Sequence, residues 1–129
     1  MKIPYGYLTK QYTEEVAEHI WKKYVKPVVM RGDFTLGDEV RGFERRMCQL
    51  TGAKYCLGVA NGTDAIWLSL KALGVGPGDE VITTVNTFIA TAASIDIVGA
   101  KPVFCDSNDQ FVIDPDEIEK HITPKTKAI

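Results

Sequence analysis

The first part of the chain has its hydrophobic positions at the spacing of helices. Apolar residues recur over 16–24, behind a Thr13 that can cap a helix and ahead of Pro27, which is expected to end it. After a loop with two glycines, a second and clearer helical pattern is expected to end near Gly52. Its apolar stripe is formed by Val40, Phe43, Met47 and Leu50.

From residue 55 onward the pattern changes to short apolar or β-branched runs separated by helical stretches. Four runs are expected to be strands, namely 55–60, 80–85, 101–105 and 126–129. Helices are predicted over 62–73 and 88–98, and a third is predicted from the capping Asp114 to about Ile122. Short apolar strands joined by helices are typical of a mostly parallel sheet covered on both faces.

These two patterns predict a helical segment, residues 1–54, followed by the beginning of an α/β domain, residues 55–129. The last expected strand has only begun at Ile129, so we expect the chain to be part of a longer domain. The glycine cluster at 74–78 follows a helix and precedes a strand, which is the reverse of the order in a dinucleotide-binding fingerprint. We therefore expect a turn there.

Composition excludes several function classes. The 15 basic and 17 acidic residues are mixed along the 129-residue chain, so no surface for nucleic acid or an anionic membrane is predicted. No apolar run is long enough to span a bilayer and no signal core follows the N-terminus, which predicts a cytoplasmic protein. The three cysteines are odd in number and widely spaced, so we expect small buried residues rather than disulfides or zinc ligands.

The strongest candidate site is the segment Asn61-Gly62-Thr63-Asp64, which falls between an expected strand and an expected helix. Ligands of open α/β sheets bind at that edge, and the free N–H groups of a helix N-terminus suit a phosphate. Gly62 lets the backbone approach a ligand closely, and Thr63 adds a hydroxyl donor. The alternative is a capped helix start without a ligand, with Asn61 as the N-cap.

Other polar and aromatic residues have simpler interpretations beside the functional ones. Phe88 opens the helix after the second expected strand, where its ring can stack on a flat ligand or belong to the core. Asp106 follows the third expected strand and favours a capping or turn role. His19 and His121 have no second ligand in register, so both are expected to be structural or surface residues and no metal site is predicted.

Together these segments resemble the DegT/StrS family of nucleotide-sugar aminotransferases. The matching segments are 32–40 with Phe43 and Glu44, 61–65, 78–83, 87–92, 99–104 and 122–129. Their order and spacing extend over nearly the whole chain. The resemblance implies an incomplete α/β fold, the N-terminal portion of the aspartate-aminotransferase large domain (PLP fold type I), with a mostly parallel sheet and flanking helices. It also implies pyridoxal 5'-phosphate (PLP) as the cofactor.

The resemblance further implies roles for individual residues. Around the cofactor these are Asn61, which shapes the turn, Gly62, Thr63 and Asp64 at the phosphate, and Phe88 on the pyridine ring. The positions that approach the sugar substrate are Tyr5, Gly32, Asp33, Phe34 and Thr35. Members of the family work as homodimers with active sites near the subunit interface, so a homodimer is expected.

The implied reaction moves an amino group from an amino acid, glutamate, to a nucleotide-linked keto-sugar, for amino-sugar, polysaccharide or antibiotic sugar biosynthesis. The Schiff-base lysine of the family and the aspartate that pairs with the pyridine nitrogen fall beyond residue 129. We therefore expect no catalytic residue in this chain and no transaminase activity from the chain alone. Two alternatives stay open: a sugar dehydratase of the same fold, in which a histidine replaces that lysine, and a non-catalytic regulatory or phosphate-binding module.

Overall fold

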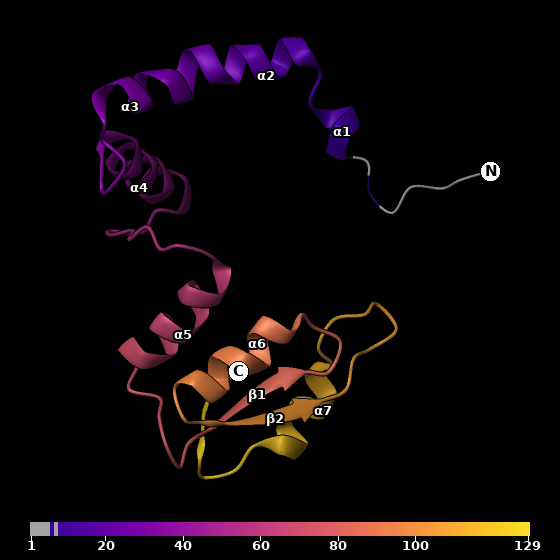
Figure 1. Ribbon diagram of the computed structural model, residues 1–129. Helices are drawn as coiled ribbons and strands as arrows, with labels where there is room; N and C mark the ends of the chain where they lie inside the picture. The colour runs from indigo at the N-terminus through magenta and orange to yellow at the C-terminus, as the bar shows by residue number, and fades with distance from the viewer. Residues whose placement is uncertain (1–5, 7) are drawn as a thin grey trace, which may run out of the picture. The chain divides into compact units, whose positions relative to one another are not determined.

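A computed structural model describes residue 6 and residues 8–129, which form two compact units (Figure 1). The units divide between Gly58 and Val59, whereas the sequence pattern changes at residue 55. The first unit carries helices and the second carries helices and a sheet. Over the described residues, no helix has the length and apolar character needed to cross a membrane.

The first unit is a succession of helices that is longer than the sequence predicts. Its elements are α1 (Leu8–Gln11), α2 (Glu14–Ile20), the π-helical turn η1 (Trp21–Val25), α3 (Lys26–Arg31) and α4 (Asp38–Thr51). The cap of α2 is confirmed, because the Thr13 hydroxyl accepts a hydrogen bond from the backbone N–H of Val16 at 3.3 Å. The expected end of the helix before Pro27 is wrong, since helical backbone continues to Arg31.

The π-helical turn explains how the chain passes Pro27. Proline lacks an N–H donor and crowds the carbonyl group four residues earlier, which normally interrupts a helix. Here Pro27 lies in the first turn of α3, the position in a helix where proline is best tolerated, and the wider turn of η1 precedes it. The helix ends instead at Gly32, whose φ of +69° is in the left-handed region.

The predicted second helix is confirmed as α4, and Gly52 ends it with a φ of +74°. Its apolar stripe is only partly covered within this unit. Val40 and Met47 are half-buried, but Phe43 and Leu50 are exposed.

The expected strand over residues 55–60 is wrong. This segment has no strand pairing in the described part of the chain, and the side chains of Tyr55 and Leu57 are each 79% exposed. A strand exists only where its N–H and C=O groups pair with a neighbour, so an apolar run is not sufficient. At the end of the segment, the backbone N–H of Gly58 donates a hydrogen bond to Glu44 Oε1 at 2.8 Å.

The second unit confirms the other predicted elements to within one or two residues. Its helices are α5 (Gly62–Ala72), α6 (Ile89–Ile97) and α7 (Pro115–His121), and its strands are β1 (Glu80–Thr84), β2 (Lys101–Cys105) and β3 (Thr126–Ala128). The strands pair in the order β2-β1-β3, and both pairings are parallel. The sheet therefore has three strands rather than the four expected.

Helices cover both faces of this sheet. The connections from β1 to β2 and from β2 to β3 run in opposite directions across the sheet, and such crossovers are almost always right-handed. That places α6 and α7 on opposite faces (Figure 1). The buried core on the α6 side contains Leu70, Val75, Val81, Ile95 and Ala100.

A buried carboxylate ties the edge strand β3 to the central strand. Glu80, at the start of β1, accepts a hydrogen bond from Thr123 Oγ1 at 2.6 Å and one from Lys101 Nζ at 3.3 Å. The backbone N–H of Glu80 also donates to the carbonyl of Lys125 at 2.8 Å. The Thr123 hydrogen bond, followed by Lys101, lowers the pKa of Glu80 below its ordinary value.

We predict that Glu80 contributes an acid-sensitive part of the stability. Because the folded pKa of Glu80 is lowered, the unfolded chain takes up the proton more readily. The contribution is complete above the ordinary glutamate pKa and is lost as the pH falls through the folded value. Denaturation of the complete protein with urea at neutral and acidic pH should show Glu80→Gln less stable at neutral pH, with the difference shrinking in acid.

The matched control is Glu119→Gln, which changes an exposed carboxylate on α7. It should follow the wild type at every pH. A Glu80→Gln curve parallel to that of the wild type would contradict the assignment.

Candidate functional site

The N-terminus of α5 has the cap that the sequence predicts, and it leaves two donors free. Asn61 Oδ1 accepts a hydrogen bond from the backbone N–H of Asp64 at 2.9 Å, and the Asn61 carbonyl accepts from Ala65 at 3.1 Å. Among the described residues, the backbone N–H groups of Gly62 and Thr63 have no acceptor. Two donors therefore remain at the positive end of the helix dipole.

Asp64 supports this turn through both carboxylate oxygens. Oδ2 accepts from Asn61 Nδ2 at 3.3 Å, and Oδ1 accepts from Trp67 Nε1 at 2.9 Å. The backbone N–H of Asp64 is occupied by the Asn61 cap. In this structure Asp64 thus orders the turn and offers no free N–H to a ligand. The sequence reasoning missed Trp67, although its position three residues after Asp64 is a readable helical spacing.

A contact from α6 also reaches this turn. The side chain of Ser94 is fully buried, and its hydroxyl donates to the carbonyl of Thr63 at 3.2 Å. This bond joins residues 31 positions apart in the sequence. No local pattern indicates such a pairing, so Ser94 was also missed.

The turn and Phe88 lie toward the same edge of the sheet. The chain passes from the end of α5 through the turn at 73–79 directly into β1, so α5 runs back along the sheet and its N-terminus lies toward the carboxyl end of β1. Phe88 follows that carboxyl end as the N-cap of α6. Its side chain is 76% exposed, so the ring does not belong to the core of this unit.

The space beside the turn is open. A Cβ built on Gly62 would meet no atom within 4 Å, so neighbouring atoms of the chain do not require a glycine there. The φ of Gly62 does not require one either, because it lies outside the left-handed region. Open space, two free N–H groups and the Thr63 hydroxyl are together suited to hold a phosphate.

The remaining candidates take the simpler roles. Asp106 Oδ1 accepts from the backbone N–H of Ser107 at 2.8 Å, a local contact with the next residue. His121 Nδ1 lies 2.9 Å from the carbonyl of Glu117 within α7. All three cysteines are free. Cys105 is buried as expected, whereas Cys48 and Cys56 are only half-buried. Over residue 6 and residues 8–129, no group of His, Cys, Asp and Glu side chains is arranged to hold a metal ion.

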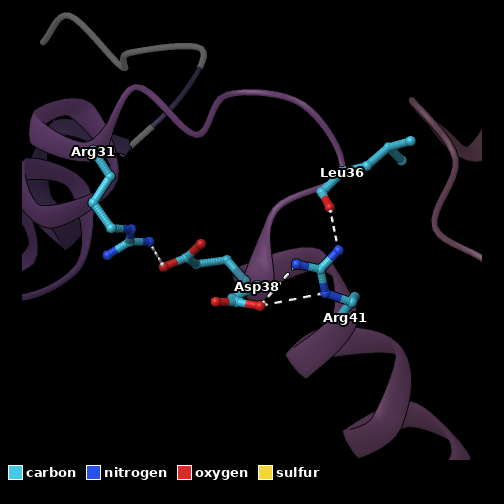
Figure 2. A network of polar contacts seen from close by, with 5 residues as sticks. Arg31, Leu36, Asp38 and Arg41 are labelled. Atoms are coloured by element: carbon cyan, nitrogen blue, oxygen red, sulfur yellow. Dashed lines mark hydrogen bonds and ion pairs between the residues drawn. The ribbon is translucent and has the colours of Figure 1, made fainter.

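The other predicted site residues lie in the first unit, in the loop between α3 and α4 (Figure 2). Phe34 and Thr35 are exposed, and Asp33 is half-buried. Tyr5 lies outside the described residues.

Two arginine–carboxylate pairs flank this loop. Arg31 Nη2 donates to Glu39 Oε1 at 2.5 Å, and Arg41 Nη2 donates to Asp38 Oδ1 at 2.8 Å. The hydrogen bond from Arg41 lowers the pKa of Asp38, and the bond from Arg31 lowers the pKa of Glu39. Both carboxylates are therefore charged at neutral pH.

Known proteins resemble nearly the whole chain. Residues 15–129 match the DegT/DnrJ/EryC1/StrS aminotransferase family. A UDP-2-acetamido-2-deoxy-3-oxo-D-glucuronate aminotransferase of Pseudomonas aeruginosa is 48% identical over 106 residues, covering 81% of this chain and 30% of that protein. A pleiotropic regulatory protein of Geobacillus stearothermophilus is 48% identical over 131 residues, covering 100% of this chain and 34% of that protein.

The fold is also found in solved structures. NtdA from Bacillus subtilis, solved with bound cofactor PMP, matches with a TM-score of 0.89 and 38% identity, covering 98% of this chain and 29% of that one. The chain thus spans about a third of the length of these proteins. The predicted fold, the N-terminal portion of the aminotransferase α/β domain, is confirmed.

We predict that the Asn61 cap contributes measurably to stability. Asn61→Ala removes the acceptor for the Asp64 N–H and should lower the free energy of unfolding by about 1 kcal/mol. Asn61→Ser keeps a capping oxygen and should remain close to the wild type. Urea denaturation of the complete protein measures both. An equal loss in the two variants would assign the effect to the Asn61 Nδ2 bond with Asp64 instead of the cap.

Proposed function

Because the chain belongs to the DegT/DnrJ/EryC1/StrS aminotransferase family, we propose that it forms the phosphate-binding part of a PLP-dependent sugar aminotransferase. The observation that carries the proposal is the pair of free N–H groups at Gly62 and Thr63 beside open space. The relative NtdA, which shares this fold, binds PMP, the amino form of pyridoxal phosphate.

In this proposal the chain's own residues bind and orient the cofactor. The N–H groups of Gly62 and Thr63 and the Thr63 hydroxyl donate to the phosphate, and the dipole of α5 favours its negative charge. Asn61 and Asp64 hold the turn in the shape that presents these donors. Phe88 places its exposed ring against the flat pyridine ring. The cofactor, when bound, supplies the electron sink for moving an amino group.

The proposed substrates are an amino acid, glutamate, and a nucleotide-linked keto-sugar. The P. aeruginosa relative is named for such a sugar, which supports this class. On the side of the sugar we propose Tyr5 and the loop residues Gly32, Asp33, Phe34 and Thr35. The Asp33 carboxylate and the Thr35 hydroxyl are groups that pair with sugar hydroxyls.

The proposal extends to the organisation of the complete protein. Residues 1–54 form an N-terminal helical segment, and residues 55–129 begin the PLP-binding α/β domain. The complete enzyme is a cytoplasmic homodimer that supplies amino sugars for polysaccharide or antibiotic biosynthesis. The family resemblance is the support for these points.

A regulatory role is the second candidate. The G. stearothermophilus protein, which matches along the whole chain, is named a pleiotropic regulatory protein. Turnover separates the two functions, because a purely regulatory protein consumes no amino donor.

The direct test incubates the complete protein with PLP, glutamate and a panel of nucleotide-linked keto-sugars. The panel begins with UDP-2-acetamido-2-deoxy-3-oxo-D-glucuronate, after which the P. aeruginosa relative is named. The proposal expects glutamate-dependent formation of an amino sugar from at least one member. Binding of PLP with no turnover of any panel sugar would favour the regulatory candidate.

We predict that Thr63→Ala in the complete enzyme weakens PLP binding about tenfold, the effect of losing one hydrogen bond to a charged group. Relative turnover among the panel sugars should stay the same, because Thr63 is proposed to contact the phosphate alone. The control is Ser69→Ala on the same helix, whose exposed hydroxyl donates to the carbonyl of Ala65 within α5. PLP titration followed by absorbance measures both variants. If Thr63→Ala bound PLP with the affinity of the wild type, the turn would act as a helix cap and not as a phosphate site.

We also predict that this chain by itself has no transaminase activity. Lys101 begins β2 and Lys125 immediately precedes β3, so both lie at the edge opposite Phe88, and Lys71 is exposed near the far end of α5. We propose that the lysine that links the cofactor lies beyond residue 129. Treatment of the chain with PLP and borohydride, followed by peptide mapping, should label no unique lysine. A uniquely labelled lysine together with turnover would contradict this prediction.

A further inference from the structure

The loop from Gly32 to Gly37 is held in an unusual backbone conformation. Leu36 has a φ of +52°, in the left-handed region that residues with a side chain rarely adopt. Gly37 is buried, and a Cβ built on it would lie 2.6 Å from Asp33 Oδ2. Such conformations persist only where the surrounding contacts hold them.

Arg41 makes the contacts that hold this end of the loop. Its Nη1 donates to the carbonyl of Leu36 at 2.9 Å, while Nε and Nη2 donate to Asp38 Oδ1 at 3.3 and 2.8 Å (Figure 2). One planar guanidinium therefore bonds the strained residue and the first turn of α4 together. A lysine, with a single ammonium group, cannot reproduce this fork of donors.

The other end of the loop is attached to the same helix turn. Arg31, the last residue of α3, bonds Glu39 in the first turn of α4. Both ends of the loop are thus fastened to α4, and Phe34 and Thr35 lie exposed between them. Any relaxation of Leu36 to an ordinary φ changes the path of the backbone next to these two residues.

We propose that Arg41 is a positioning residue that holds the loop in the conformation that receives the sugar substrate. The inference rests on the proposed function, which assigns Gly32, Asp33, Phe34 and Thr35 to the sugar. Arg41 acts through the carbonyl of Leu36 and contacts no substrate itself.

Arg41→Ala and Arg41→Lys in the complete enzyme test the inference. With glutamate and the panel sugar that gives the highest turnover, the KM for the sugar should rise roughly tenfold, the effect of losing charge-assisted hydrogen bonds. The KM for glutamate and the affinity for PLP should stay unchanged, which a general folding defect would not permit. The matched control is Arg46→Ala, on the same helix and with the same loss of charge, which should resemble the wild type.

Gly37→Ala disturbs the same loop by a second route that does not involve Arg41. Its φ of −73° is ordinary for alanine, so the added methyl group acts only by displacing the Asp33 carboxylate. It should raise the KM for the sugar as well, and it should add nothing when Asp33→Ala is already present. An Arg41→Ala enzyme with the kinetics of Arg46→Ala, or with equal losses for both substrates and PLP, would overturn the inference.

Hydrogen exchange separates this inference from the proposed function. If the wild type converts no panel sugar, the proposed function fails, but the amide of residue 41, which donates to the carbonyl of Gly37 at 3.2 Å, should still be less protected from exchange in Arg41→Ala than in Arg46→Ala. Equal exchange in the two variants would refute the role of Arg41 in holding the loop, whatever the enzyme's activity.

Discussion

Parallel hydrogen bonding on both sides of β1 is the constraint from which the arrangement of the second unit follows. Parallel neighbours cannot be joined by a tight turn, so each connection must return across a face of the sheet, and α6 and α7 make these crossings. All three strands then end at the same edge. Because α5 leads directly into β1, its N-terminus also lies toward that edge, where Phe88 begins the next helix. The candidate site is a consequence of strand direction.

The donors at this edge stay free because the turn satisfies its other polar groups internally. Asp64 is hydrogen-bonded to both Asn61 and Trp67. The Ser94 hydroxyl donates to the carbonyl of Thr63. What remains is a pair of N–H groups with no acceptor in the described chain. An anion at that point would complete the hydrogen bonding of the helix end, which is the physical reason to associate the turn with a phosphate.

The loop between α3 and α4 follows a different principle. Its backbone is not supported by a sheet or a core, and exposed ion pairs by themselves contribute little to stability. The Arg41 guanidinium bonds the backbone carbonyl of Leu36 and the Asp38 carboxylate at the same time. It therefore fixes the geometry of the loop more than it adds to stability. In this loop the backbone conformation depends on polar side chains, whereas in the second unit it depends on the sheet and its apolar core.

The sequence by itself determined the elements whose signals are local. The cap at Asp114, the left-handed glycine at 52 and the β-branched run from Glu80 were sufficient, because capping, φ preference and side-chain shape act over a few residues. The same holds for the turn at residues 61–64, whose cap and free donors lie within four residues.

Tertiary structure decided what depends on distant partners. The apolar run 55–60 is not a strand because no neighbouring strand pairs with it in the described chain, and the helix passes Pro27 because a π-helical turn precedes it. Ser94 and Arg41 gain their roles from carbonyl groups that only the folded chain brings within reach. The conformational preference of a helix or turn depends on a few neighbouring residues and can be predicted from them. A hydrogen bond between segments distant in the sequence forms only when the fold brings both partners together.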